Sequence, residues 1–182
     1  MTAPLATIPV GVLVERSKSM NQWAEFYWRA TGVLAGQPAT AAWTKLSDDG
    51  ERATFYAGTA EIELYRTETT FYRDNLASGA PGLWVALRAA EGEPPFTVAA
   101  VTADPAEGEM LTETATDLVE QVPMPLPIQH VIAAFVGQHH VEQPFVKRKR
   151  DRADPEILAR RGPPLGNDHG GNDHGGKDHE RG

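Results

Sequence analysis

The stretch RATFYAGTAEIELYR, residues 52–66, contains the clearest structural pattern of the chain. After Gly58, apolar side chains alternate with acidic or polar ones, and the apolar set consists of Ala60, Ile62 and Leu64. Because successive side chains of a β-strand point to opposite faces, this alternation predicts a strand with one buried and one solvated face. Since glycine weakens a strand interior, we expect two consecutive strands, over residues 52–56 and 59–66.

The same alternation recurs on both sides of this stretch. Residues 8–15 place aliphatic side chains at every second position, namely Ile8, Val10, Val12 and Val14. Such a row predicts a strand with one face in the core. The other segments that we expect to form strands are the end of residues 23–34 and the runs 43–46, 83–88 and 96–102.

Two helices are expected among and directly after these strands. The first covers residues 68–77. Thr67 should cap it, and Phe71 and Leu76 should form its apolar side. The second should begin after Asp104, which can cap it, with Pro105 in the first helical position. Glu107 could complete a capping box, and this helix should run to about residue 114.

A last core helix is expected over residues 128–139, after an extended or turning connector of residues 122–127. Its apolar stripe consists of Val131, Ile132, Phe135 and Val136. We therefore expect an α+β fold in which C-terminal helices cover one face of a twisted antiparallel sheet of about six to seven strands. The alternative is a small, partly closed β-barrel with a capping helix.

Formal charge divides the chain into three parts. Residues 1–146 carry eight Lys or Arg against eighteen Asp or Glu, and we expect them to form the globular domain. Residues 147–161 carry seven Lys or Arg against three acidic residues, and this predicts a basic docking arm, because so polar a segment cannot bury a core. Residues 162–182 are rich in Gly, Asn, Asp and His and are expected to be disordered.

The basic arm predicts a protein-binding segment. An apolar residue beside a cluster of cations can anchor a contact while the charges steer association. The residues expected to contact the partner are Phe145, Lys147, Arg148, Lys149, Arg150 and Arg152. The alternative is a solvated linker. A nucleic acid is not the expected partner, because the acidic domain would repel a polyanion and only Phe145 is available for stacking.

The tail suggests a second function, metal binding. His169, His174 and His179 recur every five residues, and each directly follows an Asp. Imidazole and carboxylate are ligands for zinc or nickel, and a glycine-rich chain could wrap around one ion. Ordering such a chain costs conformational entropy, so the composition favours the alternative, a solubilising tail.

A third interpretation places a ligand groove on the folded domain. Its residues would be Tyr65, Arg66, Tyr72 and Trp84. The pattern favours the alternative, a half-buried helix whose polar side chains reach solvent. Trp23 and Trp28 lie beside a loop, where a ligand platform is also compatible with the sequence. No phosphate-binding loop, dinucleotide fingerprint or nucleophile elbow occurs, so no catalytic residue is predicted.

Cysteine and long apolar runs are both absent from the sequence. Without cysteine there are no disulfides and no thiolate chemistry. The N-terminal apolar run is broken by Pro9 and Gly11, and no run reaches the roughly 20 apolar residues that cross a bilayer. We therefore expect a cytoplasmic protein that does not insert into membranes.

Four segments carry a resemblance to a known family. They are IPVGVLVERSKSMNQWAEFYWRATGVLAG (8–36), FYAGTAEIELYRTETTFYRDNLASGAPGLWVALR (55–88), VPMP (122–125) and HHVEQPFVKRKRDR (139–152). They resemble an uncharacterised bacterial group known as domain of unknown function 3305, over roughly residues 8–160. Members tend to be encoded beside genes for molybdenum-dependent formate dehydrogenases and their maturation factors. The resemblance therefore implies an accessory role in that system. Together with the basic arm and the lack of catalytic motifs, it leads us to expect a non-catalytic accessory protein that binds such a subunit or factor.

Some members of this group carry the label of a molybdenum-cofactor guanylyltransferase. Such enzymes resemble doubly wound nucleotide-binding folds, with a glycine-rich phosphate loop after the first strand. Here the first strand ends in VERSKS, residues 14–19, which contains no glycine. A molybdenum-cofactor or nucleotide-binding protein is therefore kept only as a further alternative.

Overall fold

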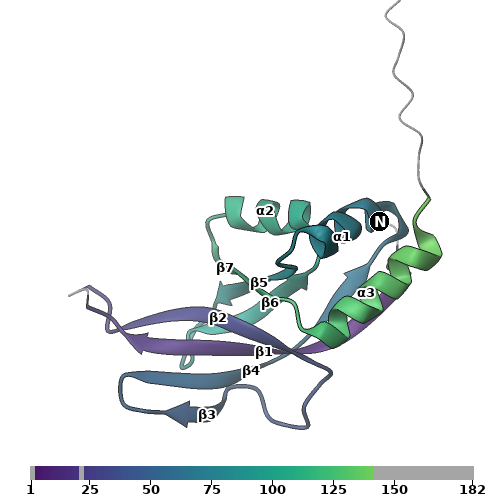
Figure 1. Cartoon of the computed structure of the whole chain (residues 1–182). Helices are drawn as coiled ribbons and strands as arrows, with labels where there is room; N and C mark the ends of the chain where they lie inside the picture. The colour runs from purple at the N-terminus through teal and green to yellow at the C-terminus, as the bar shows by residue number, and fades with distance from the viewer. Residues whose placement is uncertain (1–2, 21–22, 142–182) are drawn as a thin grey trace, which may run out of the picture. The chain divides into compact units, whose positions relative to one another are not determined.

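The computed structural model describes residues 3–20 and 23–141 (Figure 1). The chain divides into two units, Met1–Glu142 and Gln143–Gly182. The second unit lies outside the described residues, and so do the predicted basic arm and the His-rich tail. In the first unit, the described residues form seven strands, three α-helices and one short 3-10 helix.

The larger of two sheets contains four antiparallel strands. In the order in which they pair, they are β2 (Phe26–Ala35), β1 (Ala6–Lys18), β4 (Arg52–Leu64) and β3 (Thr44–Asp48). The predicted inward row of β1 is confirmed, because all four of its aliphatic side chains are buried. In β4, Ile62 and Leu64 are fully buried, whereas Glu61 and Glu63 on the opposite face are exposed.

The prediction of two strands around Gly58 is wrong, because β4 runs through this glycine without a break. The pairing of β1 with β4 shifts by one residue here, since Val12 lies opposite Gly58 while Leu13 lies opposite Tyr56. Gly58 has φ = 136°, a conformation that side-chain-bearing residues rarely adopt. The glycine therefore accommodates a β-bulge within one long strand.

The smaller sheet contains three antiparallel strands, in the order β6 (Phe96–Thr102), β5 (Gly82–Ala89) and β7 (Asp117–Pro123). The strand β7 was not predicted from the sequence, and only its last residues fall in the predicted connector of residues 122–127. In β7, Val122 is the one buried residue, so this edge strand lacks the alternation of apolar residues on which the other predictions relied.

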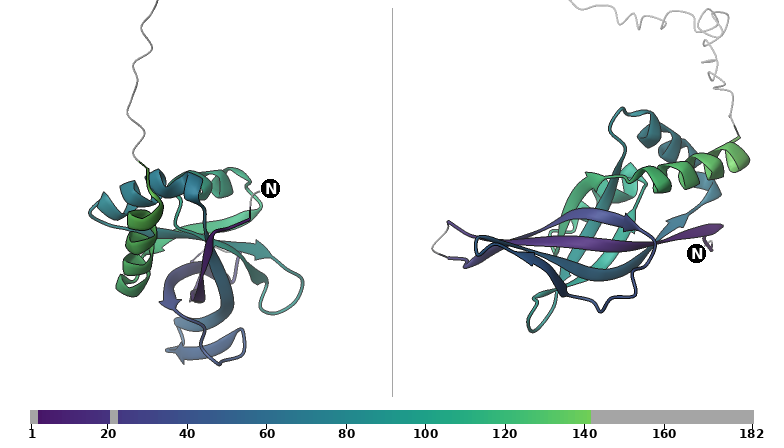
Figure 2. Two further views of the ribbon diagram at one scale, coloured as in Figure 1. Left: turned by 90° about the vertical axis from the view of Figure 1, so that its right-hand side faces the viewer. Right: turned by 60° about the horizontal axis from the view of Figure 1, so that its bottom comes forward.

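The fold class is confirmed as α+β, but the single sheet of six to seven strands is wrong. The described strands form two sheets, and they do not form a closed barrel. The sheets face each other, with β4 beside β6 and β2 beside β7, and α1 and α2 lie on the other face of the smaller sheet (Figures 1 and 2). The helical crossover between β4 and β5 carries the chain from one sheet to the other.

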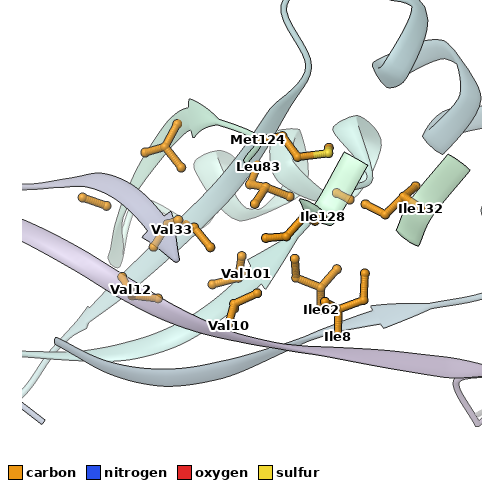
Figure 3. Close-up of a cluster of buried hydrophobic side chains, with 14 of the residues drawn as sticks. Ile8, Val10, Val12, Val33, Ile62, Leu83, Val101, Met124, Ile128 and Ile132 are labelled. Atoms are coloured by element: carbon orange, nitrogen blue, oxygen red, sulfur yellow. The ribbon is translucent and has the colours of Figure 1, made fainter. Parts of the chain in front are cut away.

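A single hydrophobic core lies between the sheets and extends to α3 (Leu126–His139). Figure 3 shows Val10 and Ile62 of the larger sheet, Leu83 and Val101 of the smaller one, and Ile128 of α3 in one cluster. Burial of such side chains is the main favourable term in folding. The helix α3 thus closes one end of the space between the two sheets.

The helix α1 (Thr69–Ala77) buries polar residues, and of the predicted apolar side only Leu76 packs against the core, partly buried. Phe71 is 42% exposed, whereas Tyr72 and Asn75 are buried. The Asn75 side chain donates to the carbonyl oxygens of Gly82 and Ala103, each at 2.8 Å, and accepts from the Gly82 N–H at 3.0 Å. The predicted cap is also wrong, because the 3-10 helix Arg66–Glu68 precedes α1 and no side chain caps it.

The helices α2 (Pro105–Glu113) and α3 agree better with expectation. The Asp104 carboxylate accepts from the Ala106 N–H at 2.8 Å and caps α2, as predicted. Glu107 instead accepts a hydrogen bond from the Thr102 hydroxyl at 2.6 Å. In α3, the buried residues are Ile128, Ile132 and Phe135. Val131 is 48% exposed and does not belong to the buried stripe that the sequence predicted.

Candidate functional site

The predicted partner-binding and metal-binding residues lie outside the described residues. The partner-binding set consists of Phe145, Lys147, Arg148, Lys149, Arg150 and Arg152, and the metal set consists of His169, His174 and His179. Both remain predictions. Within the described part of the chain, no three His, Asp or Glu side chains are grouped so that they could hold a metal ion. No helix of that part is long and apolar enough to cross a membrane.

The described chain ends beside a hydrogen-bonded contact between α1 and α3. The Nδ1 atom of His140 lies 3.1 Å from the Thr69 hydroxyl, and its Nε2 atom lies 3.0 Å from an Arg73 Nη1 atom. Because a guanidinium can only donate, Nε2 accepts and the proton of a neutral imidazole is assigned to Nδ1. Thr69 in turn donates to the Arg66 carbonyl oxygen at 3.1 Å. This contact holds His140, the residue that follows α3, against α1.

One surface of α3 carries no charge. Residues 121–141 contain no Asp, Glu, Lys or Arg, in a domain with a large excess of acidic residues. Positions three and four apart share a helix face, and the exposed members of one such face are Pro127, Val131, Ala134 and Gln138. Leu126, at the start of the helix, is 60% exposed, and Val141, directly after it, is 63% exposed. We call this set the α3 face.

The predicted groove residues do not share one environment. Tyr72 is buried in the core, where its ring lies 6.2 Å from that of Phe135 and its hydroxyl accepts from the Tyr65 N–H at 3.2 Å. Burial raises the pKa of Tyr72 to about 12, helped by nearby carboxylates. Trp84 lies against α2, and Arg66 is exposed. The structure brings Tyr65 and Tyr72 together and leaves Trp84 in contact with another helix.

A cluster of aromatic rings surrounds Arg16 at the opposite end of β1 from α3. The guanidinium carbon of Arg16 lies 4.3 Å from the centroid of the Phe26 ring, 5.8 Å from that of Trp28 and 5.6 Å from that of Phe55. The rings of Trp43 and Phe96 pack against Trp28, with centroids 6.0 and 6.1 Å away. We call these six residues the Arg16 cluster.

The sequence analysis noted Trp28 beside a loop but missed the Arg16 cluster. Two alternating rows could have indicated it. Arg16 continues the inward row that begins at Ile8, and Phe26 and Trp28 occupy alternate positions of β2. Phe55 precedes the bulge in β4 and lies opposite Val14 of β1. Its membership of the Arg16 cluster follows only from the three-dimensional structure.

Comparison with known proteins identifies a family. No curated protein and no solved structure matches the chain. The family model described as "Protein of unknown function (DUF3305)" matches residues 9–149. The match includes nearly all of β1, every later strand and helix of the described domain, and the first three residues of the basic run, Lys147 to Lys149. Because it covers well over half of the 182 residues, the chain belongs to the DUF3305 family of proteins of unknown function.

Proposed function

We propose that this chain is a non-catalytic accessory protein that binds a protein partner through the α3 face and the basic arm. The observation that carries the proposal is the charge-free, exposed α3 face, which is followed in sequence, after residues 142–146, by a segment with an excess of basic residues. Cores of protein interfaces are depleted in charge, and charged residues at their rims steer association. The two adjoining segments therefore fit an apolar patch bordered by carboxylates.

The partner that we propose is a subunit of a molybdenum-dependent formate dehydrogenase, or one of its maturation factors, as the family resemblance implies. The acidic domain would not bind such an acidic surface by its own charge, so the arm supplies the attraction. Phe145 would anchor the contact, and the basic side chains would pair with carboxylates of the partner.

Co-purification with the formate dehydrogenase tests this function. The tagged chain and a variant with Lys147, Arg148, Lys149 and Arg150 all changed to Gln would be compared at several salt concentrations. We expect the variant to capture less enzyme and its remaining capture to depend less on salt, because screened charge pairs supply that part of the affinity. Equal capture by both proteins at every salt concentration would exclude the arm.

A second candidate function is metal handling by the tail. It is favoured by the repeated Asp-His pairs that end at His169, His174 and His179. Neutral imidazole binds zinc and nickel, and the neighbouring carboxylate can bind the metal or orient the ring. Calorimetric titration of the full chain with either metal tests this function, as set out in the Discussion.

A further inference from the structure

We propose that the Arg16 cluster is a binding site for a small monoanionic carboxylate with a flat apolar body. The site lies on the domain itself, roughly 26 Å along β1 from Ile8 and the α3 end, so it is separate from the α3 face. It does not depend on the accessory function proposed above.

The position of Arg16 is unusual for a cation. It continues the row of β1 whose other members, Ile8 to Val14, are buried, and it is itself half-buried between rings from β2 and β4. Arginine is rarely buried without a partner. Within the described part of the chain its side chain is held by contacts with rings and not by a carboxylate, so the guanidinium is positioned before any anion arrives.

The donors of Arg16 are unused within residues 3–20 and 23–141. Three neighbouring cations of this end are paired, Lys18 with Glu51 at 3.2 Å, Arg29 with Glu15 at 3.2 Å and Lys45 with Asp48 at 2.7 Å. Arg16 makes no hydrogen bond or ion pair to another residue of the described ranges.

Asp48 does not compete for these donors. Its carboxylate accepts from Lys45 Nζ and from the Gly50 N–H at 3.0 Å. Those two bonds are the main reason why the pKa of Asp48 lies below its usual range, and Arg16 adds only a weaker long-range attraction. Among the described residues, therefore, none occupies the fork of the guanidinium.

The chemistry of the cluster selects the ligand class. A guanidinium fork matches a carboxylate with two parallel hydrogen bonds, and adjacent rings that exclude water strengthen such charge-assisted bonds. A single guanidinium in a strongly acidic domain suits a monoanion better than a phosphate dianion, which the remaining charge would repel. The aromatic rings of Phe26 and Trp28 offer stacking surfaces to a flat apolar group.

Titration of the isotope-labelled full chain, followed by nuclear magnetic resonance, tests this site. The probes are benzoate, its neutral analogue benzamide, acetate and inorganic phosphate, all at constant ionic strength. We expect benzoate to shift the Arg16 Nε–H and Trp28 indole N–H resonances saturably, acetate and phosphate to bind more weakly, and benzamide to cause no saturable shift.

Variants connect the response to the guanidinium. Arg16→Gln should weaken benzoate binding about tenfold or more, because it removes the charge-assisted bonds. Arg16→Lys, which keeps the charge without the fork, should give an intermediate affinity. Arg29→Gln is the matched control, since Arg29 lies on the opposite face of the sheet and should leave binding unchanged. Thermal unfolding of each variant establishes that it is folded.

Three results would overturn the proposal. They are the absence of saturable shifts with benzoate, an equal response to benzamide, and benzoate affinity in folded Arg16→Gln or Arg16→Lys equal to that of the natural chain. The second and third would mean that the rings bind aromatic solutes without any contribution from the Arg16 fork.

Discussion

At the scale of single residues, Asn75 connects three elements. Its amide bonds both backbone groups of Gly82, at the start of β5, and the carbonyl oxygen of Ala103, after β6. Since buried backbone groups without partners are costly, this one side chain satisfies groups that the two strand ends would otherwise leave unpaired. It also explains why α1 buries a polar face.

Replacement of Asn75 should therefore be strongly destabilising. We expect Asn75→Ala to lower the free energy of unfolding by about 3 kcal/mol, because it leaves buried donors and acceptors unpaired. The neighbouring control Asp74→Ala should change it by less than about 0.5 kcal/mol, since Asp74 is exposed and pairs only with Arg73. Denaturant unfolding measures both, and equal effects would contradict the role given to Asn75.

Asp104 leads to a prediction about pH. Burial raises the pKa of its carboxyl above the ordinary value of 3.8, despite hydrogen bonds from the Ala106 and Glu107 N–H groups. A raised pKa in the folded state means that stability is present while the carboxyl is protonated and is lost as the pH rises from 3.8 through the folded-state pKa. Asp104→Asn keeps a good capping residue without this titration.

The stability of Asp104→Asn relative to the natural chain should therefore increase as the pH is raised from about 3 to 7. Denaturant unfolding at a series of pH values measures the difference between the two proteins. A difference that stays constant, or that decreases with rising pH, would show that burial does not penalise the charged carboxylate.

At the scale of elements, the packing of α2 on the smaller sheet depends on a glycine. A Cβ atom added to Gly108 would lie 2.3 Å from the ring of Trp84, closer than any real contact. The indole thus occupies the space that a side chain of α2 would otherwise fill. In α3, by contrast, a Cβ atom added to Gly137 would meet no atom within 4 Å.

The two glycines should respond in opposite directions to the same substitution. Gly108→Ala should lower the free energy of unfolding by about 1–3 kcal/mol, because the helix must move away from Trp84. Gly137→Ala should stabilise by up to about 1 kcal/mol, because alanine is the better helix former and the space is open. Thermal or denaturant unfolding tests the pair. Stabilisation by both would mean that Trp84 can move at little cost.

Sequence patterns predicted the elements whose faces differ in polarity. The aliphatic row of β1, the alternation in β4 and the capping of α2 by Asp104 depend on local physics, and all three are confirmed. The edge strand β7 and the buried polar face of α1 depend on tertiary partners. The alternation of apolar and polar residues along the sequence does not indicate which partners a segment will have. The division into two sheets and the Arg16 cluster likewise depend on which strands meet, and the sequence analysis left the strand order open.

At the scale of the whole molecule, charge is distributed very unevenly along the chain. Residues 1–146 have an excess of ten negative charges, and residues 147–161 have an excess of four positive charges. The exposed α3 face lies near the end of the acidic region and carries no charge. An acidic partner surface would be repelled by the domain and attracted by the arm, which restricts binding to one orientation.

The metal candidate also belongs to this scale. If the tail binds zinc or nickel, a full-length variant with His169, His174 and His179 changed to Asn should lose most of the heat of binding measured by calorimetry. The matched control is His130→Asn, which changes an exposed histidine of α3 and should leave the titration unchanged. Equal heats for the triple variant and the natural chain would remove the tail as a metal site.

The affinity of the full chain for the purified formate dehydrogenase tests the central proposal most directly. Calorimetry at low and moderate salt would compare the natural chain with Val131→Glu on the α3 face and with the control Met110→Glu. The control also replaces an exposed apolar side chain with a carboxylate, but on α2. We predict binding that weakens with salt, falls at least about tenfold in Val131→Glu and is unchanged in Met110→Glu. No binding by the natural chain, or equal binding by Val131→Glu, would contradict the account.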